Sequence, residues 1–150
     1  MELIFNEWFV EYIAPGSGDE QLVAAILDVL EARGEVLFVR RKSPWVDKLY
    51  RYANQSARER RRLVRRFFLL MRNPAVVRLV DEEEIGNLPA LLEEVTPRKD
   101  RYLVELAAVS RDRTIVTTDS ALRAAVDGNC GIRVLLLEEF LEEYGLHRIG

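Results

Sequence analysis

Short apolar runs alternate along the chain with longer segments in which apolar residues recur every three or four positions. The short runs predict strands over residues 3–5, 36–39, 75–80, 114–117 and 132–137. The longer segments predict helices over residues 6–13, 21–33, 44–72 with a break near 54–56, 87–94, 97–109, 120–126 and 138–144. The predicted strands are continuously apolar, which is typical of a sheet buried on both faces. The pattern therefore predicts an α/β fold, a three-layer α/β/α sandwich around a mainly parallel sheet.

Length and composition are those of one globular domain. The chain has 150 residues, of which 49% are hydrophobic and 31% charged, so we expect residues 1–150 to form a single domain. No apolar run approaches the roughly 18 residues of a membrane span, and the N-terminus lacks the pattern of a signal peptide. A single cysteine suits a reducing compartment, so the sequence predicts a cytoplasmic protein with no membrane partner.

Histidine and cysteine are almost absent, which limits the chemistry. The chain has one cysteine, Cys130, and one histidine, His147. A zinc site built from these residue types, a Ser-His-Asp triad and a Cys-His pair are therefore not expected. An enzyme of this composition would work with carboxylates and a hard cation, which prefers oxygen ligands.

Polar side chains stand where several of the predicted strands end. Asn6 follows the first strand, and Asp119 follows the fourth. Asp47 and Asp100 stand in first helical turns, one after the second strand and one before the fourth. Because ligands of open parallel sheets gather at the carboxyl ends of the strands, we expect these four residues to converge. Their oxygens would suit Mg²⁺ or Mn²⁺.

Each of these residues also has a purely structural interpretation. The helix dipole favours an acid in a first turn, which accounts for Asp47 and Asp100. Asp119 suits the N-cap of the helix that begins at the next residue, and Asn6 suits a cap or a turn. Taken singly, each residue favours the structural interpretation, and only their joint placement at one edge favours a metal site.

The C-terminal half of the chain resembles a known family. An aspartate opens the helical segment 100–107 (DRYLVELA), and a hydrophobic strand ends in Thr-x-Asp within 114–122 (TIVTTDSAL). The pattern closes with 131–135 (GIRVL) and 138–141 (EEFL). Over about residues 96–141 it resembles a PIN domain. The resemblance implies a parallel sheet in a three-layer sandwich and metal-dependent endoribonuclease activity, and many members are toxins of toxin–antitoxin pairs.

The resemblance also implies site residues. By it, Asp100 and Asp119 match the third and fourth acidic positions, and Asn6 matches the first, which is normally aspartate. Asp47 matches the second position, normally glutamate, by location alone. Family members usually carry Thr and then Ser or Asn after the first acid, whereas this chain has Glu7 and a tryptophan. The site is thus a weakened nuclease, a nuclease that recruits Glu7, or a catalytically inactive module.

A metal mechanism follows for an active site. Asp100 and Asp119 would hold one or two Mg²⁺ or Mn²⁺ ions, with Asn6 and Asp47 completing the shell. Such ions lower the pKa of a bound water and neutralise charge on a phosphodiester during in-line attack. Asn6 can bind through its carbonyl oxygen but removes one negative charge, which weakens metal binding.

Basic residues are concentrated in one segment and are nearly all arginine. The chain has 19 arginines, 3 lysines and a net charge of -3, whereas residues 40–72 alone carry +10. We expect five arginines of the predicted helix there to bind an RNA backbone: Arg58, Arg61, Arg62, Arg65 and Arg66. The alternative is a solvated helix face that pairs with acids elsewhere in the chain.

The partners expected from the sequence are RNA, an antitoxin-like protein and a second copy of the chain. In the homodimer, an acidic helix of one copy would face the basic helix of the other. The alternative to a nuclease is a PIN-like module without catalysis that binds RNA or a protein through its arginine-rich helix.

Overall fold

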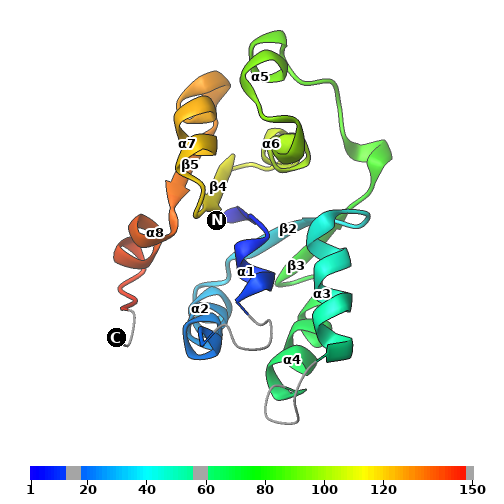
Figure 1. Ribbon diagram of the computed structural model, residues 1–150, viewed down its shortest axis with the longest axis vertical. Coiled ribbons are helices and arrows are strands. Elements are labelled where there is room, and N and C mark those ends of the chain that lie inside the picture. The colour runs from blue at the N-terminus through cyan, green and yellow to red at the C-terminus, as the bar shows by residue number, and fades with distance from the viewer. Residues whose placement is uncertain (13–17, 56–60, 148–150) are drawn as a thin grey trace.

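The computed structural model of the protein (Figure 1) describes residues 1–12, 18–55 and 61–147. Within these residues, five strands form one sheet in which every neighbouring pair is parallel. The strands are β1 (Glu2–Phe5), β2 (Val36–Arg40), β3 (Val77–Val80), β4 (Thr114–Thr117) and β5 (Arg133–Leu136). Their order across the sheet is β3-β2-β1-β4-β5, so the N-terminal strand is central. The parallel sheet predicted from the sequence is confirmed.

Helices cover both faces of this sheet. They are α1 (Trp8–Glu11), α2 (Glu20–Arg33), α3 (Pro44–Gln55), α4 (Arg61–Met71), α5 (Ala90–Val95), α6 (Arg101–Val109), α7 (Ser120–Val126) and α8 (Leu137–Glu143), with short 3-10 turns at η2 (Glu82–Glu84), η3 (Arg98–Asp100) and η4 (Asn129–Gly131). Figure 1 shows α5, α6 and α7 in the layer above the sheet, and α1 to α4 with α8 in the layer below. The fold is therefore the three-layer α/β/α sandwich expected from the pattern of strands and helices.

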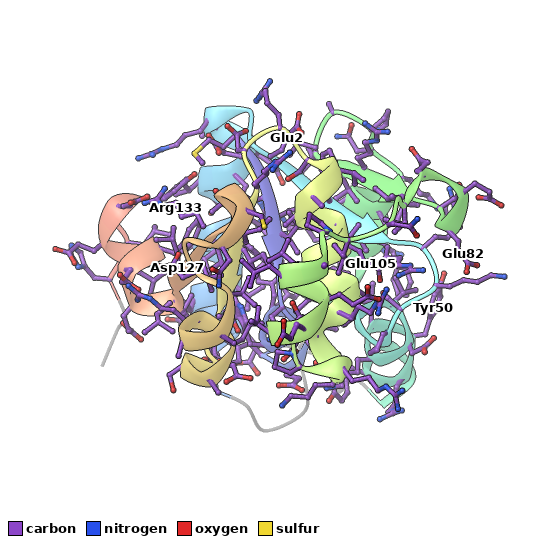
Figure 2. The ribbon with its side chains drawn as sticks, turned by 90° about the horizontal axis from the view of Figure 1, so that it is seen from above. Glu2, Tyr50, Glu82, Glu105, Asp127 and Arg133 are labelled. Carbon is purple, nitrogen blue, oxygen red and sulfur yellow. The ribbon has the colours of Figure 1, made fainter. Side chains whose placement is uncertain are left out.

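Successive residues of each strand point into two separate cores. Leu3 and Leu37 pack with the layer of α1 to α4 and α8, and the residues that follow them, Ile4 and Phe38, pack with α5, α6 and α7. Both faces are apolar because both are covered, which explains the continuous apolar runs in the sequence. Figure 2 shows side chains filling the space between the layers from Arg133 at the β5 edge to Tyr50 on the opposite flank.

Local sequence fixes where the elements begin and end. α2 stops at Gly34, whose φ of 67° is left-handed and suits glycine. α3 opens after Ser43, whose hydroxyl accepts a 3.4 Å hydrogen bond from the backbone amide of Val46. Residues 73–77 form a turn, in which the amides of Val76 and Val77 donate to the carbonyl of Asn73. β3 is therefore shorter than the predicted strand over 75–80.

The chain reverses its direction of travel across the sheet between β1 and β4. It runs outward from β1 through β2 to β3, and then crosses back to β4 and β5 on the other side of β1. In such sheets, ligands bind beyond the carboxyl ends of the two strands where the order reverses. We use the word crevice for this edge of the sheet, around Asn6, Asp100 and Asp119. The fold thus directs attention to the residues that follow Phe5 and Thr117. No helix in the described ranges is both long and apolar enough to cross a bilayer.

Candidate functional site

Asn6 and Thr117 join the carboxyl ends of β1 and β4. The side-chain amide of Asn6 donates a 3.0 Å hydrogen bond to the hydroxyl of Thr117, and its carbonyl Oδ1 accepts one of 2.6 Å from the amide of Glu7. Asn6 is only 8% exposed. Its side chain is therefore oriented by two partners, with the carbonyl oxygen keeping a second lone pair.

Asp119 follows β4 and serves two purposes with its two oxygens. Oδ1 accepts hydrogen bonds from the amides of Ala121 and Leu122, at 2.9 and 3.3 Å, and so caps α7. The capping interpretation from the sequence is therefore confirmed. Oδ2 takes no part in this cap and forms an ion pair with the ammonium of Lys99, 3.8 Å away.

Asp100 is the most unusual carboxylate of the group. It ends η3 and is 4% exposed, and its buried Oδ2 has no hydrogen-bond partner among the described residues. Burial raises the pKa of Asp100, and the negative charges of Asp119 and Glu7 raise it further, whereas Lys99 opposes the shift. An unpartnered buried carboxylate oxygen is costly unless a proton or a cation satisfies it.

Glu7 lies beside Asp100 and is balanced by a lysine from α3. The ammonium of Lys48 lies 3.8 Å from Oε2 of Glu7 and also pairs with Glu11. The hydroxyl of Tyr102 is buried close to the carboxylate of Glu7. Burial raises the pKa of Tyr102, and the nearby carboxylate of Glu7 adds to the effect. Glu7 therefore belongs to the same group of charges as Asp100.

The structure thus brings together Asn6, Glu7, Asp100 and Asp119, but not Asp47. Asp47 is exposed on α3, and its carboxylate forms no hydrogen bond or ion pair with any described residue. The next residue, Lys48, points toward α1 instead, because consecutive helical residues are about 100° apart around the axis. The sequence pattern did not single out Lys48, Lys99 or Tyr102, since isolated polar residues on helices are usually exposed.

The carboxylates fit a divalent cation that keeps most of its water. No group of three acidic, histidine or cysteine side chains in the described ranges is arranged to hold a metal by itself. Asp100 Oδ2 has no partner among the described residues, and Asp119 Oδ2 faces the exposed ammonium of Lys99. Mg²⁺ is commonly held by one or two carboxylates, with water and substrate phosphate as the other ligands. The described residues therefore offer such an ion the carboxylates of Asp100 and Asp119.

The predicted RNA-binding arginines differ in their surroundings. Arg66 pairs with Asp28 and Glu31 of α2, at 2.7 and 3.0 Å. For this residue, the structure agrees with the alternative interpretation, a helix face that pairs with acids elsewhere in the chain. Arg62 and Arg65 are exposed and have no carboxylate partner among the described residues. Arg58 and the side chain of Arg61 lie outside the described part of the structure.

Comparison of this chain with protein-family models, with curated proteins and with solved structures finds no match.

Proposed function

We propose that the crevice between β1 and β4 hydrolyses phosphodiester bonds of RNA with the help of Mg²⁺ or Mn²⁺. The observation that carries this proposal is the buried, unpartnered Oδ2 of Asp100, beside the carboxylates of Asp119 and Glu7. A folded chain has no structural use for such an oxygen, since leaving it unpaired costs free energy. A cation would satisfy Asp100 and relieve the repulsion among the three carboxylates at the same time.

Each residue of the crevice has a distinct part in this proposal. Asp100 and Asp119 would hold the cation, each through its Oδ2. Asn6 ties β1 to β4 and presents its carbonyl at the edge of the site. Glu7 adds negative charge next to Asp100. When bound, a divalent cation supplies a water of lowered pKa and positive charge for the phosphate under attack.

A binding module without catalysis is the second candidate, because of the surroundings of Asn6 and of α4. An amide replaces a carboxylate at Asn6, which leaves fewer negative charges for a metal. Arg62 and Arg65 carry charges that no described acid neutralises, which favours attraction of a polyanion. An antitoxin-like partner and a homodimer stay predictions from the sequence.

Cleavage of a labelled RNA separates these candidates. We expect wild-type protein to cleave with Mg²⁺ or Mn²⁺ and to stop in EDTA. Asp100→Asn and Asp119→Asn should each lower the rate by about 100-fold or more, since each removes a charged ligand. Glu94→Gln is a matched control, because Glu94 is an exposed acid on α5. Equal cleavage in EDTA, or full activity of both aspartate variants, would refute the proposal.

A further inference from the structure

The three lysines of the chain are not distributed like its arginines. Only 3 of the 22 basic residues are lysines: Lys42, Lys48 and Lys99. Two of these three contact carboxylates of the crevice, although Lys48 comes from α3 and Lys99 from η3. Elsewhere, the described ion pairs of side chains use arginine. In the described residues, side-chain ion pairs at the crevice are thus made by compact lysine ammonium groups, and those elsewhere by planar arginine guanidinium groups.

The two ammonium groups approach the carboxylates around Asp100 from different elements, Lys48 from α3 and Lys99 from η3. Lys99 is 3.8 Å from Asp119 Oδ2, and its charge acts on Asp100 directly. Lys48 is 3.8 Å from Glu7 Oε2, and Glu7 also acts on Asp100. Neither of these two separations is a hydrogen bond, since N–H···O bonds lie between about 2.7 and 3.2 Å. Lys48 also donates a hydrogen bond to Glu11, but an ammonium has three donors. Both groups therefore retain donors for a further acceptor.

We propose that Lys48 and Lys99 bind the phosphate groups of a single-stranded oligonucleotide at the crevice. The inference rests on the proposed function for the class of substrate, but not on catalysis. Four carboxylates gather here, from Glu7, Glu11, Asp100 and Asp119. Without local positive charge, they would repel a phosphodiester. An ammonium suits this role because it is a compact charge with three rotatable donors, which can contact one phosphate oxygen without a planar fit.

Lys48 also has a purely structural alternative. Its pair with Glu11 ties α3 to α1, and this tie alone would account for its position. Lys99 has no such alternative of comparable strength, because its side chain is 77% exposed and exposed pairs contribute little to stability. A test must therefore measure binding of a nucleic acid and stability separately.

The test uses the full-length chain and a short fluorescent oligoribonucleotide in EDTA, where metal-dependent cleavage does not occur. Lys48→Met and Lys99→Met should each raise the Kd about threefold to tenfold. Each should also reduce the slope of log K against log salt by about 0.7, the value for one phosphate contact on a single strand. Lys48→Arg and Lys99→Arg should restore most of the slope, because they keep the charge.

Lys42→Met is the matched control, because Lys42 is the third lysine and is exposed near the end of β2. It should leave the Kd within about twofold of the wild type. Unchanged affinity of both crevice variants, an equal loss in the control, or no measurable binding by the wild type would overturn the inference. A loss of thermal stability in Lys48→Met with unchanged Kd would establish the structural alternative instead.

The same proteins distinguish this inference from the proposed function. If the wild type binds the oligonucleotide through these lysines but does not cleave it with Mg²⁺ or Mn²⁺, then the hydrolysis proposal fails and the inference holds. If the wild type cleaves with metal and the lysine variants bind and cleave normally, then the inference fails and hydrolysis holds.

Discussion

The side-chain amide of Asn6 and the hydroxyl of Thr117 are 3.0 Å apart, although 111 residues separate them in the sequence. Thr117 also accepts a 3.1 Å hydrogen bond from the amide of Asp119. One hydroxyl therefore connects the end of the central strand to the residue that caps α7. The candidate ligands at the crevice are held by strand ends and a helix cap, so their positions depend on the sheet and not on a loop.

Restoring an acid at the end of β1 should strengthen metal binding. Asn6→Asp adds a negative charge near Asp100 and should bind Mn²⁺ about tenfold more tightly. Without metal, the free energy of unfolding of the variant should fall by about 0.5–1.5 kcal/mol, because the side-chain amide that donates to Thr117 is gone. Titration of the melting temperature with Mn²⁺ checks both effects. Asn87→Asp makes the same charge change at an exposed position, and an equal gain there would contradict the prediction.

Neutralising the buried acid should stabilise the metal-free protein at neutral pH. The pKa of Asp100 is raised mainly by burial, so the folded state binds this proton more tightly than the unfolded state does. In the unfolded chain this carboxyl has a pKa of about 3.9. Below that pH its protonated form contributes fully to the stability of the fold, and this contribution is lost as the pH rises through the higher pKa of the folded state. Asp100→Asn avoids that loss. The free energy of unfolding of this variant should therefore exceed that of the wild type by an amount that grows as the pH rises from about 4.

Denaturant unfolding of both proteins in EDTA, at a series of pH values, measures this difference. Asp28→Asn serves for comparison, because Asp28 is an exposed acid that pairs with an arginine. That variant should lose a small amount of stability instead of gaining any. A constant offset between Asp100→Asn and wild type at all pH values would show that Asp100 does not titrate as described.

Replacing the arginines of α4 should affect either the stability of the protein or its affinity for RNA, depending on the arginine. Arg66→Ala should cost up to about 1 kcal/mol of stability, since Arg66 pairs with Asp28 and Glu31. It should change RNA affinity little. The double replacement of Arg62 and Arg65 by Ala should leave stability unchanged and reduce the salt slope of RNA binding by about 1.4, or 0.7 for each phosphate contact. An unchanged salt slope in the double variant would exclude Arg62 and Arg65 as phosphate contacts.

The indole of Trp8 should contribute to the junction of α1 and β4. Its ring N–H donates a 2.9 Å hydrogen bond to the carbonyl of Val116, and the side chain is 2% exposed. Trp8→Phe keeps an aromatic ring but removes this donor. The carbonyl still accepts from the amide of Asn6, so we expect a loss of about 1–2 kcal/mol and a folded protein. Chemical denaturation measures the loss, and an unfolded variant would contradict this account.

The sequence predicts the fold well because the strands are short, continuous and separated by clear helix boundaries. Gly34 ends α2 and Ser43 opens α3, as their local chemistry requires. The ends of β1 and β4 also placed Asn6 and Asp119 at one edge, because a parallel sheet brings its strand ends together. These predictions needed only spacing along the chain.

The rest of the site depends on packing between distant elements. Burial of Trp45 and Leu49 sets the rotation of α3, and this rotation turns Lys48 toward α1 and leaves Asp47 outside. A difference of one residue on a helix is a change of about 100° in direction. The partners of Arg66 lie 35 and 38 residues away on α2. No local pattern specifies such a pairing.

The central position of β1 has a consequence for the order in which this protein is made. β1 is synthesised first, but its neighbour β4 begins at Thr114. One edge of the central strand therefore stays open until most of the chain has left the ribosome, and pairing across such a separation is slow. During this time, the open edge is exposed to mispairing with other strands. The crevice itself needs both β1 and β4, so it cannot assemble before β4 and Asp119 have been made.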